Sequence, residues 1–158
     1  MSTTIEHRRH DAGRRFAIVV SKFNSFVTDR LLGGAIALLE SSGVAADDLT
    51  IVRVPGAFEI PLAAQHAADS GRFDGVVCLG CIIRGETPHF EYLAAAVAHG
   101  LTTAASATGV PITFGVLTTN SAEEALARAG EGPDNKGREA ALAALELADV
   151  VAQLAQRG

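Results

Sequence analysis

The segment Arg84–Phe90 combines residue types that could act on an anionic substrate. It follows an apolar, strand-like run and precedes an Ala-rich run with helical spacing. Gly85 permits a turn, while Thr87 as a cap and Pro88 as the first helical residue are typical of a helix start. A helix N-terminus just past a strand offers free N–H groups and a positive dipole end to an anion. His89 would stand in the first turn, where an imidazole can carry protons to and from a bound molecule.

The elements that must position this segment alternate between strands and helices. We predict strands over 16–20, 49–54, 73–83 and 112–118, and helices over 27–42, 57–70, 89–108, 121–129 and 137–156. The strands are nearly all apolar, as strands buried in a parallel sheet are. Together with the right-handed crossover rule, this pattern favours a three-layer α/β/α sandwich of the flavodoxin-like type, with a four-stranded parallel sheet. We assign residues 1–14 to a flexible N-terminal arm and residues 15–158 to a single α/β domain.

Three loops are predicted to meet at one edge of this sheet. They are the loop at Phe23, the loop over 56–59, and the segment 84–89. Each follows a strand, and ligands of open parallel sheets bind outside the carboxyl ends of the strands. We therefore predict that the three loops form one shared binding site.

Composition narrows the class of protein. The chain has 158 residues and a formal net charge of −5, with its only cluster of basic residues in the short N-terminal arm. Nucleic acid is therefore not a favoured partner, since a phosphate backbone demands clustered Lys and Arg. The first fifteen residues lack the apolar run of a secretory signal, and no segment is apolar enough to cross a membrane, which favours a cytoplasmic protein. No Gly-x-Gly-x-x-Gly or Walker A loop occurs, which weakens a dinucleotide or ATP interpretation.

Cys78 and Cys81 form a C-x-x-C pair, a spacing typical of redox motifs. Redox pairs begin helices, whose dipole lowers the thiol pKa, whereas both of these residues lie inside an apolar strand pattern. Residues three apart on a strand also face opposite sides. We therefore predict two small core residues. We also predict no metal, because a second cysteine pair is lacking and the remaining histidines fit no ligand spacing: His7, His10, His66 and His99.

The C-terminal helix indicates an oligomer. Between residues 138 and 156, apolar side chains occur almost all the way round the helix. A helix that is apolar on every face must be buried on every face, and a four-stranded domain of this size cannot cover it alone. We infer packing against other copies of the chain, with a merely Ala-rich composition as the alternative.

Four stretches of the chain match a known family in order and spacing: Lys22–Thr28, Val54–Pro61, Leu79–Glu91 and Asn135–Gly137. Through them the chain resembles the 6,7-dimethyl-8-ribityllumazine synthases, transferases of the penultimate step of riboflavin biosynthesis. The resemblance implies condensation of 5-amino-6-(D-ribitylamino)uracil with 3,4-dihydroxy-2-butanone 4-phosphate, giving the lumazine, phosphate and water without metal or organic cofactor. It also implies a homopentamer, or an assembly of pentamers, with each active site between neighbouring subunits.

The resemblance further implies roles for individual residues. His89 is the implied general acid–base group, since an imidazole both accepts and donates protons at neutral pH. Phe23 would stack on the pyrimidine, and Glu59 would bind ribityl hydroxyls. The other implied substrate-binding residues are Asn24, Ala57, Phe58, Cys81, Ile82, Ile83, Phe114 and Lys136. The implied phosphate-binding residues are Gly85, Glu86, Thr87 and Arg128, and the neighbouring subunit would supply Phe114 and Arg128.

Two other classes of protein stay open at this point. A flavodoxin-like redox protein would need a Ser- and Thr-rich phosphate loop after the first strand, and Ser21–Ser25 is a poor version of one. A shell protein on the same fold that has lost activity is disfavoured by the intact set Phe23, Glu59, His89 and Arg128. The acidic turn 130–134 leaves pentamer, decamer and shell all open.

Overall fold

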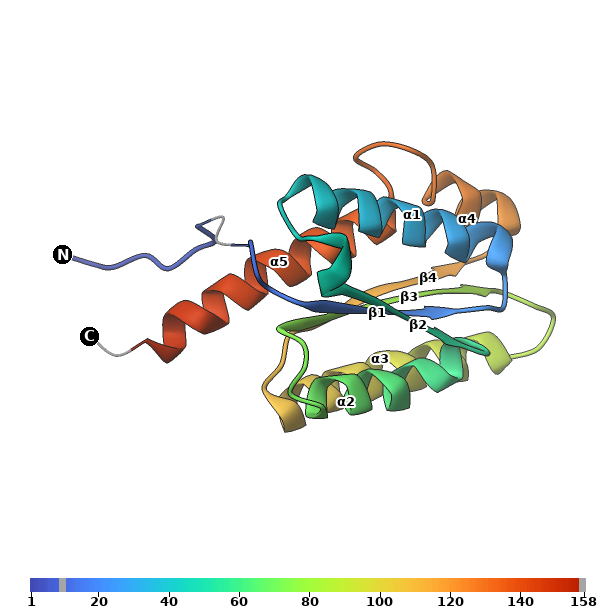
Figure 1. Cartoon of the computed structure of the whole chain (residues 1–158). Helices are drawn as coiled ribbons and strands as arrows, with labels where there is room; N and C mark the ends of the chain where they lie inside the picture. The colour runs from blue at the N-terminus through green and yellow to red at the C-terminus, as the bar shows by residue number, and fades with distance from the viewer. Residues whose placement is uncertain (9–10, 157–158) are drawn as a thin grey trace.

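A four-stranded parallel sheet forms the middle layer of the chain (Figure 1). The structure, a computed structural model, describes residues 1–8 and 11–156, so His10 lies outside the described residues. The strands are β1 (Phe16–Ser21), β2 (Leu49–Val54), β3 (Gly75–Ile83) and β4 (Ile112–Thr119). They pair in the order β2-β1-β3-β4, every neighbouring pair parallel. Because β1 and β3 are central, their carboxyl ends bring the following loops together.

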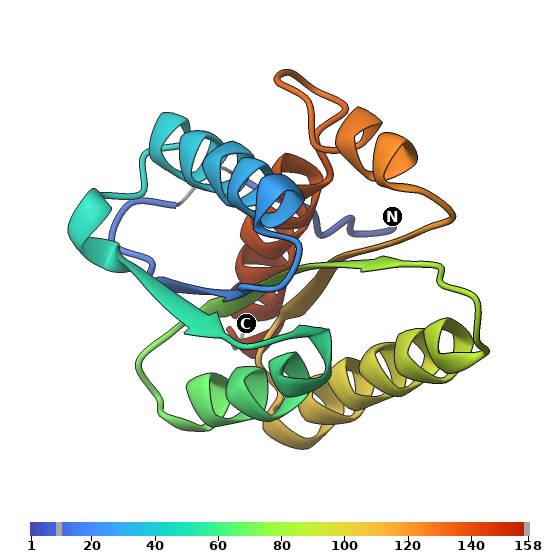
Figure 2. The same ribbon diagram turned by 90° about the vertical axis from the view of Figure 1, so that its right-hand side faces the viewer.

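Helices cover both faces of the sheet and complete the three-layer sandwich. The helices are α1 (Ser25–Ser41), α2 (Ile60–Asp69), α3 (His89–Thr108), α4 (Ala122–Ala127) and α5 (Lys136–Ala155), with short 3-10 turns at Ala46–Asp48 and Ala57–Glu59. Figures 1 and 2 show α1, α4 and α5 on one face and α2 and α3 on the other. One apolar cluster lies under α1 and α5, and a second lies under α2 and α3. The predicted fold class is confirmed.

Most predicted boundaries differ from the structure by one to three residues, and three of the differences lie at the starts of β3, α2 and α3. The third strand begins at Gly75 rather than at 73, because Asp74 instead exchanges hydrogen bonds with the backbone of Arg15. The second helix opens as the 3-10 turn at Ala57–Glu59 before it becomes α-helical. Pro88, predicted to be the first helical residue, is instead the N-cap of α3.

The two cysteines lie in β3, as predicted. Cys78 belongs to the apolar cluster under α2 and α3, and Cys81 to the cluster under α1 and α5, so they face opposite sides of the sheet. Both are unpaired thiols in the part of the chain that the structure describes. Burial raises the pKa of the Cys81 thiol to about 11 and that of Cys78 further still. Neither is therefore the reactive thiolate of a redox motif.

Helix α1 approaches the first turn of α5 so closely that only glycine fits at position 137. A Cβ on Gly137 would overlap the backbone oxygen of Leu31 and lie 2.6 Å from its carbonyl carbon. Backbone atoms cannot move aside as the end of a side chain can. The two helices would have to separate to admit even one methyl group.

We expect Gly137→Ala to lower the free energy of unfolding by about 1–3 kcal/mol, the usual effect of overpacking. Chemical denaturation followed by circular dichroism measures the difference. Gly33→Ala on α1 is the matched control, because its Cβ would meet no described atom within 4 Å. The control should match or exceed wild-type stability, since alanine favours helix by about 1 kcal/mol over glycine. Equal midpoints for Gly137→Ala and wild type would contradict the proposed close contact.

The N-terminal arm contacts the last turns of α5 through Asp149. The carboxylate of Asp149 is buried and accepts hydrogen bonds from the backbone N–H of Arg8 (2.9 Å), Nη2 of Arg14 (2.9 Å) and Nε2 of Gln153 (2.8 Å). Gln153 also donates to the backbone oxygen of Glu6 (2.6 Å). The flexibility expected for residues 1–14 stays a prediction, but these bonds fix where the arm meets the domain.

The bonds around Asp149 lower the pKa of its carboxyl. Burial by itself raises that pKa, but the hydrogen bonds from Arg8 and Gln153 act in the opposite direction. The charges of Arg14 and His7 lower it further, so the folded-state pKa lies below its ordinary value. The carboxylate therefore stabilises the fold above about pH 4, and this contribution is lost as the pH falls through the folded-state pKa.

We expect Asp149→Asn to lower the free energy of unfolding by about 2 kcal/mol at pH 7, the usual worth of hydrogen bonds to a charged group. Below about pH 4 the difference from wild type should shrink, because the wild-type carboxyl also becomes neutral. Urea denaturation at a series of pH values measures both quantities. A difference that stays constant from pH 7 to pH 3 would show that ionisation of Asp149 does not contribute.

Helix α5 is not fully covered by its own chain, as its sequence predicted. Four of its apolar side chains are more than a third exposed: Leu142, Leu147, Val151 and Leu154. Large apolar side chains are exposed elsewhere too: Phe26, Leu62 and Tyr92. No helix in the described residues is long and apolar enough to span a membrane. Exposed apolar surface of this extent is typical of protein–protein interfaces.

Candidate active site

The three loops predicted to meet do line one hollow at the carboxyl ends of β1 and β3. Its volume is about 400 Å³, within the range of small-molecule sites. The lining residues come from the loops after β1, β2 and β3 and from the first turns of α3: Phe23, Asn24, Ala57, Cys81, Ile82, Ile83, Gly85, Thr87, His89, Phe90 and Leu93. We call this hollow the His89 hollow.

The loop after β1 presents an aromatic ring to the hollow. Backbone N–H groups of Lys22 and Phe23 donate to the oxygens of Val54 (2.8 Å) and Pro55 (3.0 Å), which ties this loop to the loop after β2. Asn24 has a positive φ of 62°, a conformation that asparagine adopts more readily than most residues. Its Nδ2 donates to the backbone oxygen of Cys81 at 2.9 Å. The Phe23 ring is left 70% exposed and can stack on a planar ligand.

The turn after β2 contributes backbone to the hollow and places two larger side chains beside it. Ala57 is buried and lines the hollow, whereas Phe58 is 66% exposed and, with Glu59, is absent from the lining residues. The Glu59 carboxylate folds back over Gly56, where a Cβ would lie 3.3 Å from Oε1. A polar ligand that extends past Ala57 would meet this carboxylate.

The segment after β3 gathers hydrogen-bond donors and an imidazole at an open helix end. Among the described residues, no side chain caps the N-terminus of α3. The Thr87 hydroxyl accepts weakly from the backbone N–H of His89 at 3.4 Å. Gly85, Thr87 and His89 are exposed and line the hollow, but Glu86 does not. This arrangement can bind an anion and place a proton carrier beside it.

Arg84 holds this segment against the end of β4. Its backbone N–H donates to the oxygen of Thr119 at 2.8 Å, and its Nε donates to Oδ1 of Asn120 at 2.9 Å. The guanidinium lies 4.8 Å from the centroid of the Phe90 ring and 3.5 Å from Oε1 of Glu91. One side chain thus connects the start of α3 to the loop that leads into α4.

Helix α4 begins after this loop with the predicted capping box, in which one of the two hydrogen bonds has a different partner. The Ser121 hydroxyl accepts from the backbone N–H of Glu124 at 3.1 Å, while the Glu124 carboxylate accepts from Asn120 at 2.9 Å rather than from Ser121. At the other end of α4, the Arg128 guanidinium donates to the Glu124 backbone oxygen at 3.2 Å. The position of Arg128 therefore depends on this cap.

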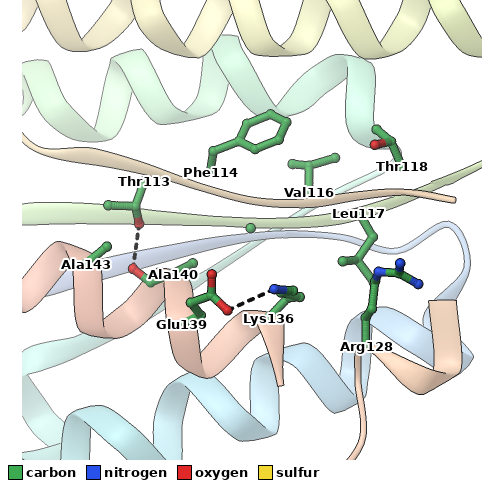
Figure 3. A pocket seen from close by; sticks show the side chains of 11 residues that line it. Thr113, Phe114, Val116, Leu117, Thr118, Arg128, Lys136, Glu139, Ala140 and Ala143 are labelled. Atoms are coloured by element: carbon green, nitrogen blue, oxygen red, sulfur yellow. Dashed lines mark hydrogen bonds and ion pairs between the residues drawn. The ribbon is translucent and has the colours of Figure 1, made fainter. Parts of the chain in front are cut away.

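Arg128 faces a second hollow, which lies along the edge strand β4 (Figure 3). Its volume is about 330 Å³, and it is lined by Thr113–Thr118, Arg128, Lys136, Glu139, Ala140 and Ala143. Figure 3 shows Phe114 projecting from one side of β4, with Arg128 and Lys136 on the other. Lys136 pairs with Glu139 at 3.0 Å, and Phe114 is 48% exposed. We call this the Arg128 hollow.

The predicted site residues therefore fall into two groups within one chain. Nine line the His89 hollow, three others (Phe58, Glu59 and Glu86) belong to its loops, and three line the Arg128 hollow. The two sets of lining residues have no member in common within the described part of the chain. Sequence reasoning did not name Phe90 and Leu93 as lining residues, although the spacing of Leu93 four residues after His89 places it on the same helix face.

Metal ligands do not gather at either hollow. Within residues 1–8 and 11–156, no three His, Cys, Asp or Glu side chains lie close enough together to hold a metal ion. The groups at the hollows include aromatic rings, backbone amides, hydroxyls, an imidazole, a guanidinium and the ammonium of Lys136, which is paired with the Glu139 carboxylate. These suit recognition of a planar heterocycle and a phosphate, with proton transfer between them.

Comparison with known proteins finds matches to one family over nearly the whole chain. A family model described as 6,7-dimethyl-8-ribityllumazine synthase matches residues 13–152. The chain is 50% identical over 154 residues to the 6,7-dimethyl-8-ribityllumazine synthase of Syntrophus aciditrophicus, covering 98% of this chain and 100% of the relative. It is 49% identical over 151 residues to the enzyme of that name from Nitratidesulfovibrio vulgaris strain DP4, covering 96% and 97%.

Proposed function

Since this chain belongs to the 6,7-dimethyl-8-ribityllumazine synthase family, we propose that its two hollows are complementary parts of that family's active site. The chain is a transferase of riboflavin biosynthesis. It condenses 5-amino-6-(D-ribitylamino)uracil with 3,4-dihydroxy-2-butanone 4-phosphate, giving 6,7-dimethyl-8-(D-ribityl)lumazine, phosphate and water. The observation that carries the proposal is the meeting of an exposed aromatic ring, open amides and His89 in one hollow.

The pyrimidine binds against Phe23 in this proposal. The exposed ring offers a face for offset stacking, and the backbone of Cys81–Ile83 at the end of β3 provides polar groups at the edge of the heterocycle. The ribityl chain then runs past Asn24 and the turn at Ala57 and Phe58 toward the Glu59 carboxylate. A carboxylate suits a polyol because its two oxygens accept several hydrogen bonds.

The phosphate binds at the open N-terminus of α3. Backbone N–H groups at Gly85 and Glu86 and the Thr87 hydroxyl are the donors, and the helix dipole adds a favourable field. The Glu86 side chain does not line the hollow, so its amide acts rather than its carboxylate. Binding here holds the four-carbon substrate beside His89.

His89 serves as the general acid–base group. The amine of the pyrimidine attacks the ketone and water leaves, phosphate is then eliminated, and ring closure releases a second water. Each step moves a proton to or from nitrogen or oxygen, and an imidazole can do both at neutral pH. The exposed position of His89 in the first turn of α3 lets its ring reach the bound carbon chain.

A neighbouring subunit completes each site in this proposal. Phe114 would cover the pyrimidine, Arg128 would bind the phosphate, and Lys136 would contact the substrate beside them. The exposed apolar side chains of α5, with those of Phe26, Leu62 and Tyr92, supply interface area for a homopentamer or a larger assembly of pentamers. We also propose a cytoplasmic location, because two unpaired buried cysteines suit a reducing compartment.

The test of the proposed function is an anaerobic assay with both substrates, followed through the absorbance and fluorescence of the lumazine. We expect formation well above the uncatalysed background from purified oligomeric protein. Dependence on both His89 and Arg128 would support the assignment of the two hollows. A folded oligomer without any rate enhancement would refute it.

Arg84 is a positioning residue in this scheme, because it holds the phosphate-binding segment from outside the hollow. We expect Arg84→Ala to raise KM for the phosphorylated substrate about threefold to tenfold, the usual worth of one or two hydrogen bonds, with a smaller change in kcat. KM for the pyrimidine should stay near its wild-type value. Arg72→Ala is the matched control, since Arg72 also lies over a ring, that of Phe73 at 5.2 Å, away from both hollows. An equal effect on both Michaelis constants would argue against selective positioning.

A further inference from the structure

A third hollow lies between α1 and the loop that joins α4 to α5. It is the largest of the three, with a volume of about 880 Å³. Its lining comes from α1, from that loop and from the first turn of α5: Arg30, Gly33, Gly34, Ala37, Ala129–Pro133, Asn135 and Arg138. None of these lining residues belongs to the lining of the His89 or Arg128 hollow within the described chain.

The fold builds the walls of this hollow in advance. Asn135 is buried, and its Nδ2 donates to the backbone oxygens of Arg30 (3.2 Å), Ala129 (3.2 Å) and Gly130 (3.0 Å). Its Oδ1 accepts from the backbone N–H of Arg138 at 3.0 Å. One amide side chain thus joins α1, the loop and α5. A ligand would enter a site whose shape is already fixed, which reduces the entropy cost of binding.

The charges in this hollow are unbalanced. Arg30 and Arg138 both line it, and across residues 1–8 and 11–156 neither guanidinium has a hydrogen-bond or ion-pair partner. Arg138 is half-buried, where an unpaired charge is costly. Glu131 also lines the hollow, but its side chain is exposed and pairs with neither arginine. Arg30 is exposed to solvent, so Arg138 is the guanidinium that lacks a partner, and an anion held between the two arginines would supply one.

We propose that this third hollow binds a small molecule that carries a phosphate group, or free phosphate. The planar guanidinium of Arg138 can bind two phosphate oxygens at once, and Arg30 supplies a second positive charge from α1. The positive end of the α5 dipole adds to the attraction. Gly33 and Ala37 contribute little side-chain volume to α1, so space remains beyond the anion for the rest of the molecule.

Gly33 offers a direct test of this proposal. A Cβ at position 33 meets no described atom within 4 Å, so Gly33→Glu should fold and place a negative charge in the hollow. Gly33→Gln is the matched control, because it has the same shape without the charge. We expect Gly33→Glu to weaken the binding of radiolabelled inorganic phosphate at least about tenfold, and Gly33→Gln no more than about threefold. Equilibrium dialysis of the full-length oligomer measures both. Equal affinity in Gly33→Glu and wild type would overturn the proposal.

Two further arms identify the site and the source of the phosphate. The double variant Arg30→Gln/Arg138→Gln should bind one phosphate fewer per chain than wild type, whereas the control Arg72→Gln should bind as many as wild type. A double variant that binds as much phosphate as wild type would also overturn the proposal. Arg128→Ala should leave this phosphate in place, which separates the third hollow from the catalytic phosphate site and makes the result independent of the proposed mechanism. Glycerol phosphate as a competing probe distinguishes a phosphate ester, which would bind more tightly, from free phosphate.

Discussion

Replacing His89 with alanine should lower kcat about a hundredfold, the lower end of what general acid–base catalysis contributes. The lower end is expected because positioning of two reactants supplies much of the remaining rate enhancement, and the stacking ring and the phosphate donors stay in place. KM for either substrate should change little, since His89 is proposed to move protons rather than to hold a substrate. Steady-state kinetics under anaerobic conditions gives both quantities.

His99 provides the control for this variant, because it lies ten residues further along the same helix and outside the lining of the His89 hollow. His99→Ala should retain wild-type turnover. His89→Asn separates binding from proton transfer, since an amide can donate a hydrogen bond but does not titrate near neutrality. Its kcat should stay as low as that of His89→Ala, because an amide cannot carry a proton between the reacting groups. Wild-type turnover in His89→Ala would remove this residue from the mechanism.

The sequence predicted the fold well because the apolar strand patterns and the glycines at helix ends match the elements that the structure contains. The apolar strands 16–20 and 75–83 form the centre of the sheet, where burial on both faces demands such a pattern. Gly43 and Gly109 end their helices with positive φ, as glycine after a helix predicts. The meeting of Phe23, Ala57 and His89 followed from one rule, that loops after parallel strands share an edge.

Other features were beyond the sequence because they depend on contacts between distant segments. Pro88 takes the N-cap position of α3 rather than the first position inside the helix. The two positions differ by one residue, and sequence patterns do not locate a helix end that closely. Phe114 looks like a core residue in an apolar strand, and only the edge position of β4 shows that its ring is exposed. The unpaired state of Arg30 and Arg138 appears only once α1 and α5 are placed side by side by Asn135.

Replacing Arg128 with alanine should raise KM for 3,4-dihydroxy-2-butanone 4-phosphate about tenfold to a hundredfold, the range expected for charge-assisted hydrogen bonds to phosphate. KM for the pyrimidine should change much less, because Arg128 contacts only the phosphorylated substrate in the proposed site. Arg128→Lys keeps the charge but not the bidentate fork, so its KM should fall between those of Arg128→Ala and wild type. An unchanged KM in Arg128→Ala would remove this residue from the phosphate site.

The division of the site between two hollows makes a further prediction for mixed oligomers. If each active site takes His89 from one chain and Arg128 from its neighbour, then His89→Ala and Arg128→Ala chains can repair each other. Unfolding the two variants together and reassembling them in equal amounts should restore about one quarter of the wild-type sites, from random order around a cyclic oligomer.

Separately reassembled variants that are mixed afterwards should stay as inactive as each variant alone, which controls for transfer of chains during the assay. The double variant, His89→Ala with Arg128→Ala in one chain, reassembled with wild type should give the same one quarter of intact sites at random order. Recovery in that second mixture but not in the first would mean that both residues act within one chain. The two hollows would then have to meet by a rearrangement of β4 and α4, instead of through a subunit interface.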